Sequence, residues 1–287
     1  MSCLTLLFAA LRTILLALPL AIAMMIGVLI ELSLAPLIWP FFPKVYKKIT
    51  LFFAKLWWFL AVMCCRLACS KIELLGDEIP AKENALVIAN HQTGADITVL
   101  LDLAYQKKQL DALKWFTKDT LKYVPFFGWG LYLADGIFVK RSWFKDKNKI
   151  IKIFHRILTY KLNFWILCFV EGTRFNPKKT VQSAAFFRAK GMKPLRYVLK
   201  PKPSGFIASL EHLRGQTQAV YDLTIIYPTQ NPKMRDYFLA RYDKIIIHCR
   251  RFSISEMPKE AIDDWLLARF QEKDALIESY RKNLNFQ

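Results

Sequence analysis

The sequence predicts an α/β fold: a largely parallel central sheet flanked by helices, preceded by an N-terminal membrane-embedded helical hairpin. Two observations support this prediction. From Lys71 onward, apolar runs typical of buried strands alternate with amphipathic runs typical of helices, and such alternation indicates a largely parallel sheet. Before Lys71 the chain is mostly apolar and contains two long hydrophobic stretches. We therefore expect membrane-anchoring helices over residues 1–70 and one globular domain over residues 71–287.

The composition combines strong positive charge with high hydrophobicity. The 287 residues include 42 Lys and Arg against 23 Asp and Glu, a net charge of +19, while 54% of residues are apolar. Such a content of apolar residues excludes a disordered basic tail. A basic and apolar chain suits either a membrane surface with anionic phospholipid or nucleic acid. Because the sequence shows neither a recognised nucleic-acid-binding module nor a basic stripe interleaved with aromatics, we expect a lipid bilayer and no nucleic acid.

The N-terminal region predicts two membrane helices of unequal length. Residues 13–30 are 18 consecutive uncharged residues, which as a helix are about 27 Å long against a hydrocarbon core of about 30 Å. A cleavable signal peptide is the competing interpretation, although this run exceeds the usual signal core. Prolines at 36, 40 and 43 are expected to end the first helix. The second stretch, 49–69, has an uncharged centre of only ten residues, 56–65, which favours a re-entrant or interfacial helix. Whether the pair spans the bilayer stays open.

The remaining chain predicts strands and helices in alternation. Short apolar runs predict strands at 85–89, 113–116, 136–140, 164–170, 221–227 and 244–249. Longer runs with apolar residues on one face predict helices at 97–105, 120–134, 145–160, 204–213 and 258–282. Pro125 and Gly128 are expected to break the second of these helices, and Pro258 to begin the last. Ligands of such sheets collect at the carboxyl ends of the strands, so motifs that follow strands are the candidates for a site.

The first motif runs from Asn90 to Asp96, directly after the strand 85–89. His91 and Asp96 are five residues apart and would point about 140° away from each other on one regular helix. They can pair if His91 ends the strand and Asp96 enters the first turn of the next helix. The carboxylate would then orient the imidazole as a general base. The alternative is that Asp96 caps the helix and His91 is an ordinary loop residue.

Two further motifs bring arginines to strand ends. The strand 136–140 leads into Arg141, and the strand 164–170 leads into a turn that contains Arg174. Arginine matches the geometry of a phosphate through a two-pronged hydrogen bond. Taken singly, Arg141 fits a solvated cation and the second turn fits a surface salt bridge. The residues of the two motifs are Gly136, Lys140 and Arg141, then Glu171, Gly172, Thr173 and Arg174.

In this order, the three motifs resemble the glycerolipid acyltransferase family, the lysophosphatidic acid acyltransferase group. Its signature is Asn-His-x-x-x-x-Asp, then Gly-x-Phe-x-x-Arg, then Glu-Gly-Thr-Arg, and all three stand here between Asn90 and Arg174. Residues 169–175 and 200–206 are similar to bacterial inner-membrane acyltransferases, a subgroup that includes eukaryotic lysocardiolipin and lysophosphatidic acid enzymes. The family's fourth motif is not evident. Its nearest candidates are 199–206 and 225–228, which leaves the head-group preference open.

The resemblance implies a role for each matching residue. His91 would deprotonate the sn-2 hydroxyl of a lysophospholipid, and Asp96 would orient His91. The hydroxylate would attack the thioester of acyl-CoA or acyl carrier protein, a co-substrate, without any metal or cofactor. Arg141 and Arg174 would hold the acceptor phosphate. The other motif residues would shape or support this pocket: Glu171, Gly172 and Thr173 beside the phosphate, and Asn90, Gly136 and Lys140 in support.

Several alternatives remain open from the sequence. The acceptor of first choice is lysophosphatidic acid, and the alternatives are lysophosphatidylglycerol, lysophosphatidylethanolamine and lysocardiolipin. A lipid phosphatase or hydrolase that uses His91 is a more distant alternative, because the sequence has neither Gly-x-Ser-x-Gly nor His-x-x-x-His. We expect the protein in a bacterial inner membrane with residues 71–287 facing the cytoplasm, since the basic side of a membrane protein stays inside.

Overall fold

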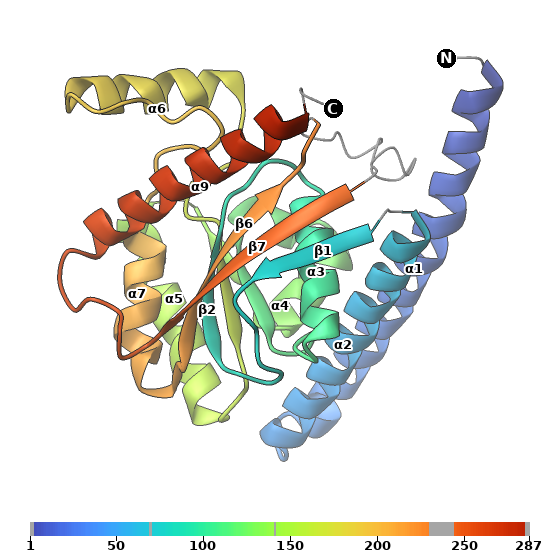
Figure 1. The fold of residues 1–287 in the computed structure, drawn as a ribbon. Coiled ribbons are helices and arrows are strands. Elements are labelled where there is room, and N and C mark those ends of the chain that lie inside the picture. Colours follow the sequence, from blue (N-terminus) through green and yellow to red (C-terminus); the bar gives the residue numbers. More distant parts are fainter. Residues whose placement is uncertain (1–2, 69–70, 141, 230–243, 285–287) are drawn as a thin grey trace.

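The computed structural model describes residues 3–68, 71–140, 142–229 and 244–284. Within these residues seven strands form one sheet, in the order β1-β7-β6-β2-β5-β3-β4 (Figure 1). All neighbouring strands are parallel except β6 and β7, which are antiparallel. The strands are β1 Lys71–Gly76, β2 Ala85–Ala89, β3 Leu113–Lys118, β4 Ile137–Val139, β5 Trp165–Cys168, β6 Ala219–Ile226 and β7 Lys244–Ser253. The predicted fold class is confirmed.

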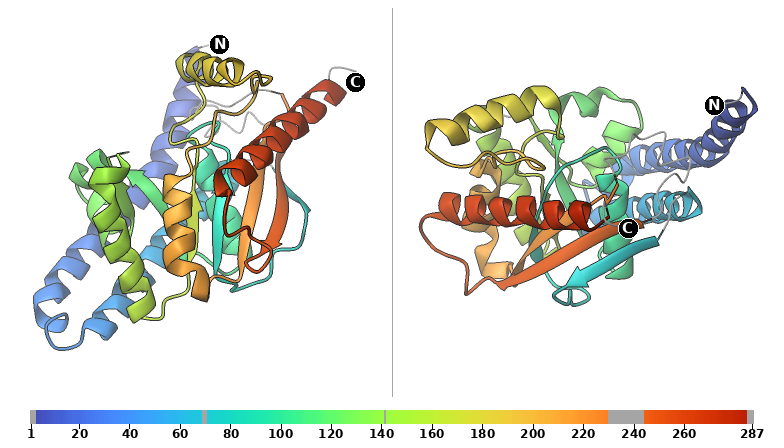
Figure 2. Two further views of the ribbon diagram at one scale, coloured as in Figure 1. Left: turned by 90° about the vertical axis from the view of Figure 1, so that its left-hand side faces the viewer. Right: turned by 45° about the horizontal axis from the view of Figure 1, so that its top comes forward.

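Helices cover both faces of this sheet (Figure 2). On one face α2 Pro43–Ala68, α3 Asp96–Gln106 and α4 Phe127–Leu133 contribute to a single hydrophobic core. On the other face the second core is built with α5 Trp143–Thr159, α6 Pro177–Ala189, α7 Ser204–Leu213 and α9 Ile262–Leu284. Short 3-10 helices occupy Asp119–Tyr123 and Arg214–Gln216.

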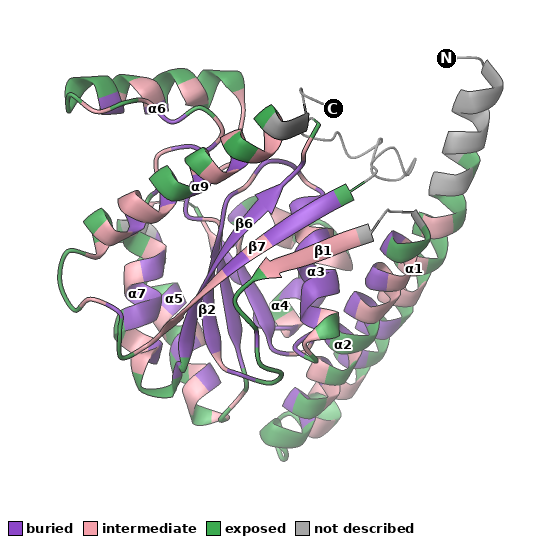
Figure 3. Cartoon of the chain, in the orientation of Figure 1, coloured by how far each residue is buried: buried purple, intermediate pink, exposed green. Residues whose placement is uncertain are grey.

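The central strand β2 shows why the sheet is buried on both sides. Ala85, Val87 and Ala89 belong to the first core, whereas Leu86 and Ile88 belong to the second. Successive side chains of a strand point to opposite faces, so a continuous apolar run fills both cores at once. The central strands of the sheet accordingly lie in the buried interior of the molecule, whereas the edge strand β1 is half-buried (Figure 3). Because β2 to β6 run in one direction, their carboxyl ends meet at one edge, where the motifs follow.

The predicted elements are found, with differences that local physics explains. β1 and α6 were not predicted as regular elements. The prediction that the last helix begins at Pro258 is wrong, since α9 begins at Ile262. Ala261 has a φ of 54°, and a residue in that left-handed region interrupts a right-handed helix. The first helix, α1 Cys3–Ile38, contains Pro36 and ends just before Pro40.

The N-terminal helices α1 and α2 pack against each other and against the domain (Figure 1). Ile14–Ile38 and Pro43–Leu67 are long and apolar enough to cross a membrane, by length and composition only. α2 thus begins before the predicted stretch 49–69 and ends within it. One side of α2 faces the protein, where the Arg66 Nε lies 2.5 Å from the Asp102 carboxylate of α3, while Lys44, Lys48 and Lys55 are exposed. The predicted division of the chain at residue 70 stays a prediction.

Candidate active site

The first motif forms a histidine–aspartate pair at the carboxyl end of β2. The strand ends at Ala89 and α3 begins at Asp96, so the chain turns between them and brings the two side chains together. The His91 Nδ1 lies 2.8 Å from the Asp96 Oδ2. The Asp96 side chain is fully buried, whereas the His91 side chain keeps 14% of its surface exposed. Asp96 therefore fixes one ring nitrogen and leaves Nε2 for another partner.

The Asp96 carboxylate is itself held from several directions. Its Oδ2 accepts hydrogen bonds from the backbone N–H groups of Gln92, at 2.6 Å, and Thr93, at 2.9 Å. Its Oδ1 accepts a hydrogen bond from the Tyr227 hydroxyl at 2.6 Å. A buried carboxylate needs such donors to offset the loss of water, and its place in the first turn of α3 also favours negative charge. These contacts fix the direction from which Asp96 meets His91.

The third motif is attached directly to His91. The imidazole stacks on the Phe169 ring, with ring centroids 4.0 Å apart. The His91 N–H donates to the Glu171 Oε1 at 3.0 Å, and the His91 carbonyl accepts from the Phe175 N–H at 2.7 Å. Residues 169–175 thus hold both the ring and the backbone of the histidine. The first and third motifs form one site.

Asn90 joins the end of β2 to the end of β6. Its Nδ2 donates to the Ile225 carbonyl at 2.9 Å, and its Oδ1 accepts from the Ile225 N–H at 2.8 Å. The side chain is fully buried. An amide that satisfies both groups of one backbone residue extends the sheet pairing beyond the last strand residue. This contact suits the supporting role predicted for Asn90.

Glu171 is buried and accepts hydrogen bonds from the backbone, and it does not line an open cleft. It is 1% exposed, and its second oxygen, Oε2, accepts from the Leu199 N–H at 3.2 Å. Burial raises the pKa of this carboxyl to about 8, although the N–H groups of His91 and Leu199 oppose the shift. Gly172 follows with a φ of 68°, the left-handed conformation that glycine adopts without steric cost, and so turns the chain away from the strand.

The residues predicted to bind phosphate are held by fewer contacts than His91 and Asp96. Arg174 is exposed, and within the described part of the chain its side chain forms no hydrogen bond or ion pair. Thr173 is half-buried beside it. Arg141 lies outside the described residues. Its neighbour Lys140 follows β4 and donates its N–H to the Asp146 carboxylate at 2.9 Å, while Gly136 precedes the strand.

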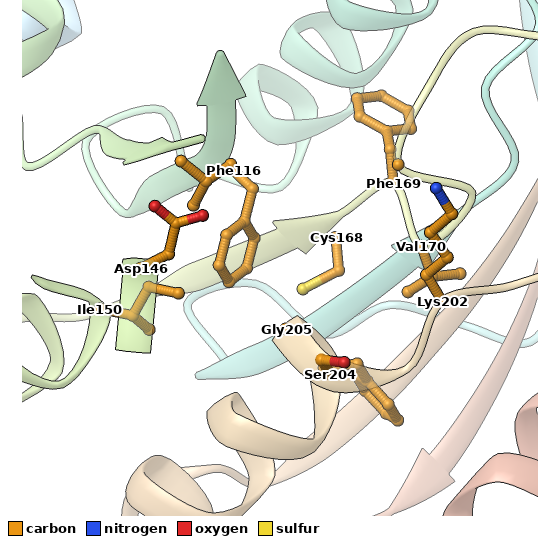
Figure 4. A pocket seen from close by; sticks show the side chains of 12 residues that line it. Phe116, Asp146, Ile150, Cys168, Phe169, Val170, Lys202, Ser204 and Gly205 are labelled. Carbon is orange, nitrogen blue, oxygen red and sulfur yellow. The ribbon is translucent and has the colours of Figure 1, made fainter. Parts of the chain in front are cut away.

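A mostly apolar cavity of about 180 Å³ adjoins this site (Figure 4). Phe169, which stacks on His91, forms part of its wall, and Val139 and Gly172 connect it to the second and third motifs. Asp146 and Lys202 contribute charge to its lining. The remaining residues of the lining are Phe116, Ile150, Cys168, Val170, Ser204, Gly205 and Phe206. Such a cavity, apolar with a few polar groups, is typical of a small-molecule site.

The sequence missed several residues that the site uses. Tyr227, Phe169 and Gln92 contact the pair or its immediate neighbours. Tyr227 ends the predicted strand 221–227 and stands in one candidate fourth motif, 225–228, which was the available signal. The other candidate, 199–206, also reaches the site through Leu199. Among the residues that the structure describes, no group of three or more His, Cys, Asp or Glu side chains is placed to bind a metal.

Comparisons with known proteins show which family the chain resembles. The family model "Acyltransferase" matches residues 71–227, and "Acyltransferase C-terminus" matches residues 239–287. In Arabidopsis thaliana, 1-acyl-sn-glycerol-3-phosphate acyltransferase 3 is 31% identical over 88% of this chain and 69% of its own. Human 1-acyl-sn-glycerol-3-phosphate acyltransferase gamma is 31% identical over 85% of this chain and 67% of its own.

Two further similarities complete the comparison. A probable 1-acyl-sn-glycerol-3-phosphate acyltransferase 5 from Arabidopsis thaliana is 33% identical over 76% of this chain, which spans only 59% of that relative's length. The crystal structure of the lysophosphatidic acid acyltransferase PlsC from Thermotoga maritima covers 99% of this chain and 98% of its own, with a TM-score of 0.57 and 15% identity. At that identity the likeness concerns the fold. The "Acyltransferase" match alone exceeds half of the 287 residues, so the chain belongs to the glycerolipid acyltransferase family.

Proposed function

We propose that this protein transfers a fatty acyl group from an acyl thioester to the free sn-2 hydroxyl of lysophosphatidic acid, giving phosphatidic acid in phospholipid biosynthesis. The observation that carries the proposal is the hydrogen bond of 2.8 Å between His91 Nδ1 and Asp96. It orients an imidazole at the sheet edge and leaves its other nitrogen for a proton. The names of the relatives support lysophosphatidic acid as the acceptor.

In the proposed reaction His91 acts first as a base. Its Nε2 accepts the proton of the acceptor hydroxyl as the hydroxyl oxygen forms a bond to the thioester carbonyl carbon. The carbon–sulfur bond then breaks, the thiolate leaves, and the imidazolium returns the proton to the sulfur. Asp96 stabilises the transient imidazolium through its bond to Nδ1. The thioester is already an activated acyl group, so this scheme needs no metal or cofactor.

The phosphate of the acceptor would bind at the two predicted arginines. Arg174 supports this assignment because it is exposed, lies three residues after Glu171 and has no hydrogen bond or ion pair within the described chain. Arg141 is assigned from its motif alone. Glu171 would act through the backbone of His91, whereas Gly172 and Thr173 would form the turn that presents Arg174. Coenzyme A and acyl carrier protein are the two proposed carriers of the donor.

The membrane is part of the proposal. The helices α1 and α2 would hold the enzyme at a bilayer, and the net charge of +19 suits one that contains anionic phospholipid. We propose a bacterial inner membrane with residues 71–287 in the cytoplasm, on the basis of this positive charge. Labelling of a cysteine introduced at exposed Lys82, with a reagent that does not cross membranes, tests the orientation. Labelling in intact cells, before lysis, would contradict it.

A panel of acceptors and donors tests the activity. Purified full-length protein in detergent is given radiolabelled lysophosphatidic acid, lysophosphatidylglycerol, lysophosphatidylethanolamine or lysocardiolipin, each with acyl-CoA or acyl carrier protein, and the lipids are separated by chromatography. We expect phosphatidic acid to form fastest, and the His91→Ala variant to form almost none. A different preferred acceptor would replace the head-group assignment. Release of free fatty acid or phosphate without acyl transfer would instead indicate a hydrolase.

A further inference from the structure

The segment 196–199, part of the loop between α6 and α7, contacts the C-terminal helix α9 on one side and the residues around His91 and Asp96 on the other. Three consecutive N–H groups of this loop converge on the Asp274 carboxylate of α9. The Oδ1 atom accepts from Arg196 at 2.9 Å, from Tyr197 at 2.6 Å and from Val198 at 3.2 Å, and Oδ2 also accepts from Arg196, at 3.1 Å. Successive N–H groups that point the same way form a concave anion-binding site, and Asp274 fills it from within the chain. Hydrogen bonds to an ionised acceptor are about twice as strong as those between neutral groups.

The other side of the same loop contacts the catalytic motifs. The Tyr197 carbonyl accepts a hydrogen bond from the Gln92 Nε2 at 2.7 Å. The Leu199 N–H donates to the Glu171 Oε2 at 3.2 Å. Gln92 follows His91 directly and donates its N–H to Asp96, whereas Glu171 accepts the N–H of His91. The loop is therefore bonded to each side of the histidine–aspartate pair.

We infer that Asp274 is a positioning residue for acyl transfer: it holds the loop 196–199, and the loop holds Gln92 and Glu171 against the His91–Asp96 pair. This inference rests on the proposed function. It also gives a task to the C-terminal segment, since Asp274 lies within residues 239–287, which match a family model separate from that of the catalytic motifs. α9 is connected to the site by these bonds even though Asp274 and His91 are 183 positions apart in the sequence.

The expected consequence of losing Asp274 follows from this chain of contacts. Without the carboxylate, three loop N–H groups lose their acceptor, and the loop no longer fixes Gln92 and Glu171. A misplacement of about 1 Å in a reacting group can lower a rate by about 10²-fold. Since Asp274 acts only through intermediate residues, we expect a smaller loss, roughly 10-fold in kcat. The KM for the acceptor should stay near its wild-type value, because Arg174 is not held by this loop.

Two substitutions and one matched control test the inference in the full-length protein. Asp274→Ala removes the acceptor, and Asp274→Asn keeps a neutral carbonyl that accepts the same N–H groups more weakly. Glu278→Gln is the control, because Glu278 is one turn further along α9 and pairs with Lys282 at 3.0 Å. kcat and KM are measured for lysophosphatidic acid and acyl-CoA, at a temperature at which thermal-shift curves show every variant folded. We expect Glu278→Gln to have the kcat of the wild type, Asp274→Asn to have a lower kcat, and Asp274→Ala to have the lowest.

A double-mutant cycle separates positioning from plain stability. Gln92→Ala removes the Tyr197 contact, so Asp274→Ala added to it should lower kcat less than it does in the wild-type background. Full additivity of the two effects, or an unchanged kcat in folded Asp274→Ala, would overturn the inference. If Asp274→Ala does not fold, the Asn variant decides in the same way. Inactive wild-type protein would refute the proposed function instead, so the two failures are distinguishable.

Discussion

The proposed catalytic pair, His91 and Asp96, and the proposed phosphate ligand, Arg174, differ in their surroundings. Asp96 is fully buried and accepts hydrogen bonds from backbone and side-chain donors, and His91 is held by Asp96, Phe169 and Glu171. Arg174 is exposed, and within the described chain its guanidinium has neither a hydrogen bond nor an ion pair. In the proposed mechanism the base is therefore positioned before any substrate binds, while the guanidinium of Arg174 is available to an anionic ligand.

Desolvation explains this difference. A buried carboxylate without donors would destabilise the fold, so the chain must supply partners for Asp96 from its own backbone and from Tyr227. An exposed guanidinium stays hydrated at little cost and can exchange water for phosphate oxygens. A histidine that is already oriented suits proton transfer, because proton transfer depends on geometry. A guanidinium without a partner suits the binding of an anion. Substitutions of these groups test the contrast, and the largest effect on turnover is expected at His91.

Loss of the base should have the largest effect on turnover. We expect His91→Ala to lower kcat by at least about 10²-fold, the usual contribution of general base catalysis. The fold should be retained, because the ring contributes one stacking contact and one side-chain hydrogen bond. Initial rates of phosphatidic acid formation and a thermal-shift curve check both parts. Wild-type turnover in a folded His91→Ala protein would remove the proposed mechanism.

Loss of the exposed cation should act on binding. Hydrogen bonds to charged groups are worth about 1.5–3 kcal/mol, so Arg174→Ala should raise the KM for lysophosphatidic acid by roughly 10- to 100-fold. The kcat should change little, since the catalytic pair does not contact Arg174. Arg174→Lys is the matched control: it keeps the charge without the two-pronged geometry and should lie between the two. An unchanged KM in Arg174→Ala would show that the phosphate binds elsewhere.

Loss of one donor to Asp96 should have a moderate effect. Tyr227→Phe removes the hydroxyl that donates to Asp96 Oδ1 and keeps the ring. A hydrogen bond to a charged group contributes about 1.5–3 kcal/mol, and only the part gained in the transition state changes kcat, so we expect kcat to fall by about 3- to 10-fold. The KM for the acceptor should stay constant, in contrast to Arg174→Ala. A variant that changes the KM and leaves kcat unaltered would place Tyr227 at the acceptor site.

The buried carboxyl of Glu171 should affect stability and its pH dependence. Burial raises the pKa of Glu171 from 4.5 to about 8, so between these values the native state binds a proton that the unfolded state has lost. This contribution to the free energy of unfolding is complete below pH 4.5 and is lost as the pH rises to about 8. Glu171→Gln should remove this part of the decline. The melting temperatures of both proteins are measured in detergent across that pH range. They should converge near pH 4.5, where Glu171 is protonated, and parallel curves would contradict the pKa shift.

The sequence by itself determined the elements whose information is local. Alternating apolar runs predicted the strands and helices. The motifs that contain His91, Asp96 and Glu171 were placed at strand ends, because each motif directly follows its strand in the sequence. The pairing of His91 with Asp96 could be predicted only under one condition: that the strand ends at His91 and the next helix begins at Asp96.

Only the tertiary structure decided which distant residues meet there. Tyr227 reaches Asp96 across 131 positions, and Asp274 reaches Tyr197 across 77. It also decided that Arg66, near the end of α2, pairs with Asp102 of α3. Such contacts depend on how β6 and α9 are placed against β2. A residue's own neighbourhood in the chain records its helix or strand preference, whereas the partner of a buried polar group is chosen by the packing of the whole sheet.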